Sequence, residues 1–242
     1  MRRRLLPYIA AIVPAAGSGL RLLSKVPKPL VAISGVPIFI RAVSALSKNA
    51  YIKEIILLGN PSNIALIKSA LKRYRIKKIK GVFLGGSTRR LSVENGLRAL
   101  SDKSDYVLIH DAVRPFVSEA LLKCVIESAL ECGAAAAGVP VKATIKKVGN
   151  YRWPVSHKNI TVVKSTVPRD NLREIQTPQV FRKDIILKAY SRCKDRFVSD
   201  DAMLVERLGV RVSVAAGSYY NIKITTPEDL ILAEAIWRAK LA

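Results

Sequence analysis

Short apolar runs alternate with longer amphipathic stretches along the first 141 residues of this chain. Runs typical of buried strands occupy residues 8–14, 52–59, 79–85, 106–111 and 134–141. Apolar residues at helical spacing fill the intervals 37–49, 63–74, 88–101 and 118–133. Strands separated by helices pair in parallel through right-handed crossovers, and both faces of the resulting sheet are covered. The pattern therefore predicts an α/β fold with a mostly parallel sheet between two layers of helices.

The rhythm changes after Val141. Residues 143–170 contain short runs rich in Thr, Val and Ile without a helical period, and we expect them to form an extended hairpin or β-arm that projects from the sheet. Helices are expected at 183–193 and 200–208, a strand at 210–217, and a final helix capped by Thr226. We expect residues 1–242 to form one domain with a three-layer, Rossmann-like fold and this projecting arm.

The balance of charge is strongly basic. The chain has 41 Lys and Arg against 18 Asp and Glu, a net charge of +23. A nucleic-acid binder is one interpretation, but the densest basic cluster, residues 71–80, lies outside any recognised nucleic-acid-binding motif. The basic residues are spread along the whole chain, so we favour an enzyme with anionic substrates and no specific nucleic-acid partner.

Cysteine, histidine and hydropathy indicate the compartment. Three scattered cysteines and two histidines exclude a disulfide framework and a histidine-rich metal centre. The start "MRRRLLPYIAAIVPAAG" has the composition of a secretory signal, but cleavage after Ala16 would remove the first strand. No apolar run approaches the roughly 20 residues of a membrane helix. We therefore expect a cytoplasmic protein without a membrane partner.

The segment "VPAAGSGLRLLSKVPKPL" (13–30) follows the first strand and combines small residues with positive charge. Gly17 and Gly19 allow backbone N–H groups to approach an anion, and Arg21 and Lys28 add full charges. The segment has neither the Walker spacing nor the third glycine of a dinucleotide-binding motif. The segment predicts a phosphate-binding loop of another type; an incidental basic surface turn is the alternative.

Five segments in order resemble the 2-C-methyl-D-erythritol 4-phosphate cytidylyltransferases. They are "PAAGSGLRLLSKVPKPL" (14–30), "GGSTRRLSVENGL" (85–97), "HDAVRPFVS" (110–118), "VPRDNLREIQTPQVF" (167–181) and "NIKITTPEDL" (221–230), and the resemblance spans about residues 8–237. It implies that the phosphate of a sugar-alcohol phosphate attacks the α-phosphorus of CTP and releases pyrophosphate. Such a reaction needs positioned positive charge.

The resemblance also implies roles for individual residues. Arg21 and Lys28 would stabilise the α-phosphate in the transition state, and Arg169 and Lys223 would hold the acceptor phosphate, which makes these four the expected catalytic residues. Independently of the resemblance, Asp111 ends an apolar strand, where a carboxylate can organise Mg²⁺ (the expected divalent cofactor) or its waters, or orient the ribose or the substrate. The expected substrate-binding residues are Pro14, Ala15, Ala16, Gly17, Gly19, Gly86, Ser92, Asp111, Ala112, Arg114, Thr144 and Thr177.

Several alternatives stay open. Asp111 and Arg114 could form a structural pair, Arg89 and Arg90 could be either solvated or functional, and His110 fits a structural role because this reaction needs no histidine base. A related enzyme acting on ribitol 5-phosphate shares the nucleotide half, so ribitol-5-phosphate cytidylyltransferase is the alternative function. In the family the arm crosses to a second subunit, which implies a homodimer with Arg169 donated in trans.

Two features depart from the family pattern. Ser199 stands where the family often has threonine, which retains the hydroxyl group. The net charge of +23 is not a property of the family, and the sequence offers no explanation beyond a general attraction for polyanions.

Overall fold

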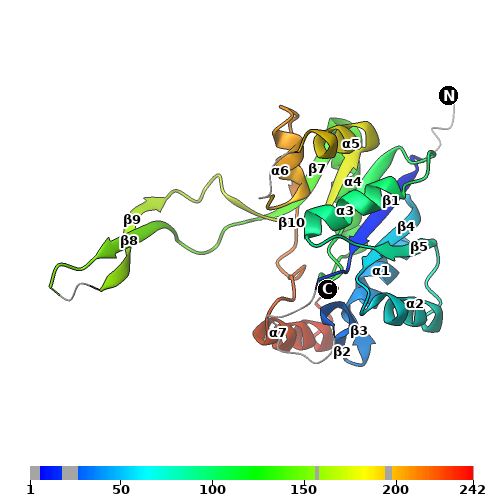
Figure 1. Cartoon of the computed structure of the whole chain (residues 1–242), viewed down its shortest axis with the longest axis horizontal. Helices are drawn as coiled ribbons and strands as arrows, with labels where there is room; N and C mark the ends of the chain where they lie inside the picture. Colours follow the sequence, from blue (N-terminus) through cyan, green and yellow to red (C-terminus); the bar gives the residue numbers. More distant parts are fainter. Residues whose placement is uncertain (1–5, 18–26, 156–157, 194–197, 242) are drawn as a thin grey trace.

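The computed structural model describes residues 6–17, 27–155, 158–193 and 198–241. A seven-stranded sheet lies at its centre, with the order β11-β7-β10-β6-β1-β4-β5 (Figure 1). The strands are β1 (Ile9–Pro14), β4 (Ile52–Gly59), β5 (Ile79–Leu84), β6 (Tyr106–Ile109), β7 (Ala134–Pro140), β10 (Arg173–Arg182) and β11 (Ser213–Ala216). From β1 the chain adds β4 and β5 on one side and then crosses to place β6 on the other side of β1. The strand order therefore reverses at β1.

Helices cover both faces of this sheet, as the alternating pattern predicts. On one face α1 (Ile38–Lys48), α2 (Ile64–Arg73) and α4 (Glu119–Cys132) pack on alternate strand residues such as Val13 and Leu57. On the other face α3 (Arg89–Arg98), α5 (Lys183–Arg192) and α6 (Asp201–Glu206) pack on Ile12 and Leu58. Successive residues of one strand thus pack into the hydrophobic cores on opposite faces of the sheet. Because both faces are buried, the strands have continuous apolar sequences.

The helix ends follow ordinary capping chemistry. Ser118 accepts a hydrogen bond from the amide of Leu121 at the start of α4, which ends at Gly133 with φ of 82°. At α7 (Pro227–Arg238), Thr226 and Asp229 form a reciprocal capping box. α7 packs on a small hairpin of β2 (Ala32–Ile33) and β3 (Val36–Pro37), which the 3₁₀ helix η2 (Lys28–Leu30) precedes.

β10 is an element that the apolar pattern does not predict. It runs antiparallel to both β6 and β7 in the middle of the sheet. Its sequence, "REIQTPQVFR", contains a proline and four charged or amide side chains before its apolar end, so it lacks the signature of a buried strand. The mostly parallel sheet is confirmed, with this one central antiparallel strand.

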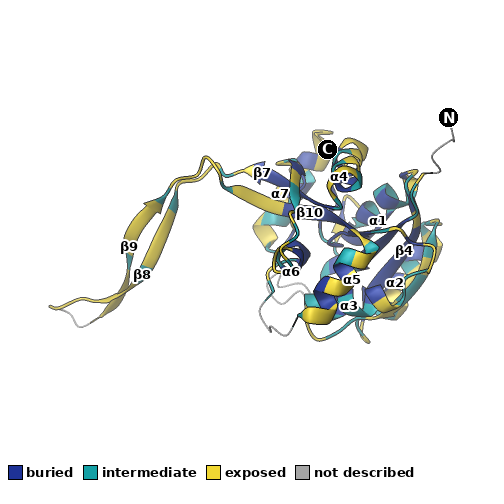
Figure 2. Ribbon diagram, turned by 90° about the horizontal axis from the view of Figure 1, so that it is seen from above, coloured by how far each residue is buried: buried dark blue, intermediate teal, exposed yellow. Residues whose placement is uncertain are grey.

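The projecting arm is confirmed as an antiparallel hairpin of β8 (Ile145–Arg152) and β9 (Asn159–Val167). It extends well away from the sheet in both views, and its strands are mostly exposed, whereas the central strands of the sheet, such as β1 and β4, are buried (Figure 2). Val148, Val155 and Val163 are at least half exposed on it. Within the described residues, no helix is long and apolar enough to cross a membrane.

Candidate active site

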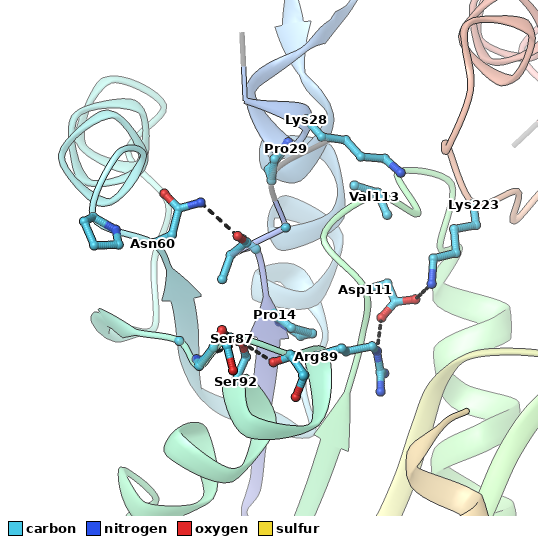
Figure 3. Close-up of a pocket in the computed structure, with 17 residues that line it drawn as sticks. Pro14, Lys28, Pro29, Asn60, Ser87, Arg89, Ser92, Asp111, Val113 and Lys223 are labelled. Carbon is cyan, nitrogen blue, oxygen red and sulfur yellow. Dashed lines mark hydrogen bonds and ion pairs between the residues drawn. The ribbon is translucent and has the colours of Figure 1, made fainter. Parts of the chain in front are cut away.

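A cavity of about 670 Å³ lies at the carboxyl ends of the central strands (Figure 3). Its walls come from the loops that follow β1, β4, β5 and β6, together with Lys28 of η2 and Lys223 from the segment before α7. Ligands of open α/β sheets bind at this edge, where the strand order reverses. The volume lies within the range of small-molecule sites, roughly 300–1,000 Å³.

Two asparagines hold the loop after β1. Asn60 donates its side-chain amide to the carbonyl of Ala16 at 2.8 Å, and the fully buried Asn63 donates to the carbonyl of Ala15 at 2.9 Å. The backbone amide of Asn60 in turn donates to the side-chain oxygen of Asn63 at 2.8 Å. Because both loop carbonyls are engaged on this side, the loop has a fixed path along the cavity wall up to Gly17.

The loop after β5 needs its glycines for close packing. A Cβ atom at Gly85 would lie 2.7 Å from the Ser92 hydroxyl and 2.8 Å from the Cβ of Ala16, and one at Gly86 would lie 2.3 Å from the Cβ of Leu91. The Ser92 hydroxyl accepts a hydrogen bond from the amide of Gly86 at 3.1 Å. Two loops that are distant in sequence are thereby joined into one narrow wall.

Asp111 is the centre of the charged part of the site. Arg89 donates from Nε to Oδ1 of Asp111 at 2.9 Å, and Lys223 Nζ lies 2.8 Å from Oδ2 (Figure 3). Burial opposes ionisation of Asp111, but the charges of Arg89 and Lys223 outweigh it and hold the pKa of Asp111 well below its ordinary value. The carboxylate is therefore ionised throughout the physiological range and orients two cations at the cavity.

His110 and Thr177 support Asp111 from behind the cavity. The Thr177 hydroxyl accepts from the amide of Asp111 at 3.0 Å and lies 3.2 Å from His110 Nδ1, while His110 Nε2 lies 3.0 Å from the carbonyl of Arg114. Burial lowers the pKa of His110 to about 4, so the ring is neutral. A neutral ring satisfies both contacts only by accepting from Thr177 and donating from Nε2. His110 thus has structural contacts here, in agreement with the expectation that the reaction needs no histidine base.

The structure brings many of the expected site residues to this cavity. Those that line it are Pro14, Ala15, Ala16, Gly17, Lys28, Gly86, Ser92, Asp111 and Lys223. Ala112, Arg114 and Thr177 are buried behind its wall, where Arg114 donates to the carbonyl of Asn221 at 2.7 Å. Gly19 and Arg21 lie outside the described residues.

Thr144 and Arg169 lie elsewhere, at the base of the arm. Both are exposed, neither lines the cavity, and Arg169 donates a hydrogen bond to the carbonyl of Lys142.

Sequence reasoning missed Asn60 and Asn63 and left the role of Arg89 open. Asn60 and Asn63 follow β4 in an ordinary turn sequence, and only their helix-start spacing hinted at a role. Arg89 was one of two adjacent arginines that the sequence could not distinguish. In the structure Arg89 bridges Asp111 and Asp201, whereas Arg90 pairs with Glu94 on the surface of its own helix.

A doubly wound sheet with a glycine-walled, cation-lined cavity at its switch point defines a nucleotide-binding enzyme of the nucleotidyltransferase class. The profile of the 2-C-methyl-D-erythritol 4-phosphate cytidylyltransferase family matches residues 9–239. The chain therefore belongs to this family and is a cytidylyltransferase.

Individual relatives agree with this assignment. A 2-C-methyl-D-erythritol 4-phosphate cytidylyltransferase of Syntrophus aciditrophicus is 43% identical over 232 residues, 95% of each chain. The crystal structure of a 4-diphosphocytidyl-2C-methyl-D-erythritol synthase from Anaerococcus prevotii superposes with a TM-score of 0.80 at 35% identity, covering 96% of this chain and 99% of that one. The crystal structure of a 2-C-methyl-D-erythritol 4-phosphate cytidylyltransferase from Thermus thermophilus superposes with a TM-score of 0.72 at 32% identity, covering 95% of this chain and 98% of that one.

Proposed function

We propose that this protein transfers the cytidylyl group of CTP to 2-C-methyl-D-erythritol 4-phosphate and releases pyrophosphate, a step of the non-mevalonate route to isoprenoid precursors. The observation that carries the proposal is the match of the family over residues 9–239, combined with a cavity whose described lining comes from four of the five resembling segments. The family assignment favours this acceptor over ribitol 5-phosphate.

In the reaction a phosphate oxygen of the acceptor forms a bond to the α-phosphorus of CTP. The bond from that phosphorus to the α,β-bridging oxygen breaks, and the electron pair leaves with pyrophosphate. Negative charge therefore grows on the α-phosphate and on the leaving group, and fixed cations stabilise it. We assign this role to Lys28 and Arg21, with Lys223 holding the acceptor phosphate.

The narrow wall suits a pyrimidine. Ala16, Gly85, Gly86 and Ser92 pack too closely to leave room for further side-chain atoms. We assign this part of the cavity to the cytosine ring, where backbone groups and the Ser92 hydroxyl can pair with the base edge and the larger ring system of a purine is excluded.

The donor set bears on Mg²⁺. Asp111 is the only carboxylate among the described residues that line the cavity, and both of its oxygens already pair with cations. The described residues contain no cluster of three or more metal-binding side chains. They do not fit a resident metal site, so we propose that Mg²⁺ arrives with the triphosphate, whose oxygens and water supply most of its ligands.

We propose that the arm pairs two copies of the chain. A two-stranded hairpin is marginally stable alone in water, and Val148, Tyr151 and Val163 leave much apolar surface exposed on it. Arg169 and Thr144 at its base would then reach the cavity of the second copy.

Pyrophosphate release with CTP and Mg²⁺ tests the function, with 2-C-methyl-D-erythritol 4-phosphate and ribitol 5-phosphate compared as acceptors. A kcat/KM at least about a hundredfold higher for the methylerythritol phosphate is expected, since a site built to bind polar groups of one substrate rejects others strongly. A preference for ribitol 5-phosphate would overturn the acceptor assignment, and inactivity with both would overturn the reaction.

A further inference from the structure

A buried chain of polar contacts leads from the helical layer to the cavity. The Tyr190 hydroxyl of α5 donates to Oδ1 of Asp201 at 2.5 Å, and Oδ2 of Asp201 lies 2.8 Å from Nη2 of Arg89. Nε of Arg89 then binds Asp111, which holds Lys223. The chain of contacts thus links two residues that do not line the cavity, Tyr190 and Asp201, to one assigned to the acceptor phosphate.

Burial makes these contacts strong. Asp201 is 1% exposed and Tyr190 6% exposed. Burial alone would lower the pKa of Arg89, but the charges of Asp201 and Asp111 outweigh this effect and raise the pKa above its ordinary value. Burial, together with the neighbouring charge of Asp201, raises the pKa of Tyr190 above its ordinary value, so its hydroxyl remains a donor.

The start of α6 is itself fixed to the sheet. Gln179 of β10 donates to the side chain of Asp200 at 2.8 Å and accepts from the amide of Ala202 at 3.0 Å. These two bonds flank Asp201 on both sides. The carboxylate that faces Arg89 is therefore held by the backbone around it as well as by Tyr190.

Removal of the Asp201 charge would disturb the far end of this series of contacts, at Asp111 and Lys223. Arg89 divides its guanidinium between two carboxylates, one atom to each. With Asp201 neutralised, the guanidinium can turn both donors onto Asp111, because bidentate pairing is the geometry that an arginine and a carboxylate favour. Arg89 would then compete with Lys223 for Oδ2 of Asp111, which Arg114 also approaches at 4.0 Å.

We propose, on the basis of the function assigned above, that Asp201 and Tyr190 are positioning residues that place Lys223 for the acceptor phosphate through Arg89 and Asp111. The pair sets affinity for the acceptor and leaves affinity for the nucleotide unchanged, since the Asp201 side chain pairs with the side chains of Tyr190 and Arg89 and not with the backbone of the described loops after β1, β4 and β5.

Calorimetric binding to full-length protein tests the proposal without turnover. The acceptor, 2-C-methyl-D-erythritol 4-phosphate, is titrated into protein saturated with Mg²⁺ and an α,β-methylene analogue of CTP, which cannot react. Asp201→Asn is expected to raise the Kd of the acceptor about tenfold and to change the Kd of the analogue less than about twofold. Tyr190→Phe, which removes a single hydroxyl, is expected to raise the acceptor Kd about threefold.

Glu206→Gln is the matched control. Glu206 is exposed at the end of the same helix, α6, and does not line the cavity, so this change removes a carboxylate charge from α6 while leaving Asp201 and Arg89 in place. Both Kd values of this variant should equal those of the wild type. Melting temperatures identify any variant that does not fold; if Asp201→Asn is one, Tyr190→Phe carries the test.

A double-mutant cycle with Lys223→Met separates positioning from a general structural effect. If Asp201 acts through Lys223, Asp201→Asn changes the acceptor Kd less than about twofold once Lys223 is replaced. An undiminished tenfold change in that background, or equal losses for acceptor and analogue, overturns the proposal. A wild type that binds the analogue but no acceptor overturns the proposed function instead, so the two failures are distinguishable.

Discussion

At the scale of single residues, this site depends on partners that fix each functional group in place. Asp111 holds Lys223 and Arg89, while Asn60 and Asn63 hold the loop that begins at Ala15. The sequence indicates Asp111 and Lys223 because both fall in segments that resemble a known family. It cannot indicate Arg89, since nothing in the order of residues distinguishes a buried arginine from the other basic residues, and its partner Asp201 lies more than a hundred positions away.

Lys28 tests the assignment of transition-state stabilisation. Replacement of Lys28 by alanine is expected to lower kcat about 10²–10³-fold, because one preorganised cation is lost where charge develops. The melting temperature should stay that of the wild type. Steady-state pyrophosphate release measures kcat, and thermal unfolding measures the melting temperature. Lys103→Ala, at an exposed lysine outside the cavity, is the control. Near-normal turnover of Lys28→Ala would remove the role.

Asn63 tests the asparagine clamp. Asn63→Ala leaves the carbonyl of Ala15 and the amide of Asn60 without their partners, which should lower the free energy of unfolding by about 1–3 kcal/mol and weaken CTP binding. Urea titration and nucleotide binding measure the two effects. Ser69→Ala, an exposed change on α2, should stay within about 0.5 kcal/mol. Unaltered CTP affinity in Asn63→Ala would show that the clamp does not shape the site.

His110 predicts how stability depends on pH. Its pKa is about 4 in the folded protein, chiefly through burial, and about 6.5 when unfolded, so between these values the unfolded chain binds the extra proton. Its contribution is fully present above pH 6.5 and is lost as the pH falls toward 4, by about 3 kcal/mol at most. Denaturant titrations from pH 4 to 7 should show a shallower slope for His110→Gln than for the wild type. Equal slopes would exclude His110 as the cause.

At the scale of elements, the helices and strands that could be predicted are those with a regular spacing of apolar residues in the sequence. The strands buried on both faces and the amphipathic helices carry an unambiguous period, and the structure has each of them within a few residues of its expected position. β10 was missed because it contains polar residues such as Gln176 and Thr177, which form hydrogen bonds to Ser218 and to the amide of Asp111. The hairpin of the arm was predictable from its β-prone composition.

Mixing two inactive variants tests whether the arm crosses between subunits. Lys28→Ala and Arg169→Ala are each expected to be nearly inactive alone. If Arg169 acts in trans, a mixed dimer contains one site with both residues intact, so equal mixing after subunit exchange restores about a quarter of wild-type activity. If Arg169 acts within its own chain, no mixed dimer has a complete site and activity stays at the level of the variants. Light scattering on the same samples confirms the dimer.

At the scale of the whole molecule, charge is the least explained property. A net charge of +23 exceeds what the cavity requires, and most of it is distributed over surfaces away from the site. Such a field speeds the encounter with CTP and with sugar phosphates, and salt weakens it. Nothing in the described structure explains why the excess is so large.

Chelation distinguishes a resident metal from one carried by the substrate. With EDTA in excess, pyrophosphate release should fall to background, because the triphosphate loses its ion. The melting temperature of nucleotide-free protein should not change, since the described residues hold no metal cluster. Calorimetric scans with and without EDTA measure this. A lower melting temperature in EDTA would reveal a bound ion and return Asp111 to the role of a metal ligand.

The arm joins strands that are already neighbours. It leaves the sheet after β7 and returns in β10, and Pro140 at the end of one strand pairs with Arg173 at the start of the other. Any length of chain can therefore be inserted or deleted between these two residues without a change in the order of the strands. Mutation and selection can thus reshape the arm without rebuilding the sheet, and a tight turn grafted between Pro140 and Arg173 offers a direct route to an isolated sheet domain that lacks Thr144 and Arg169.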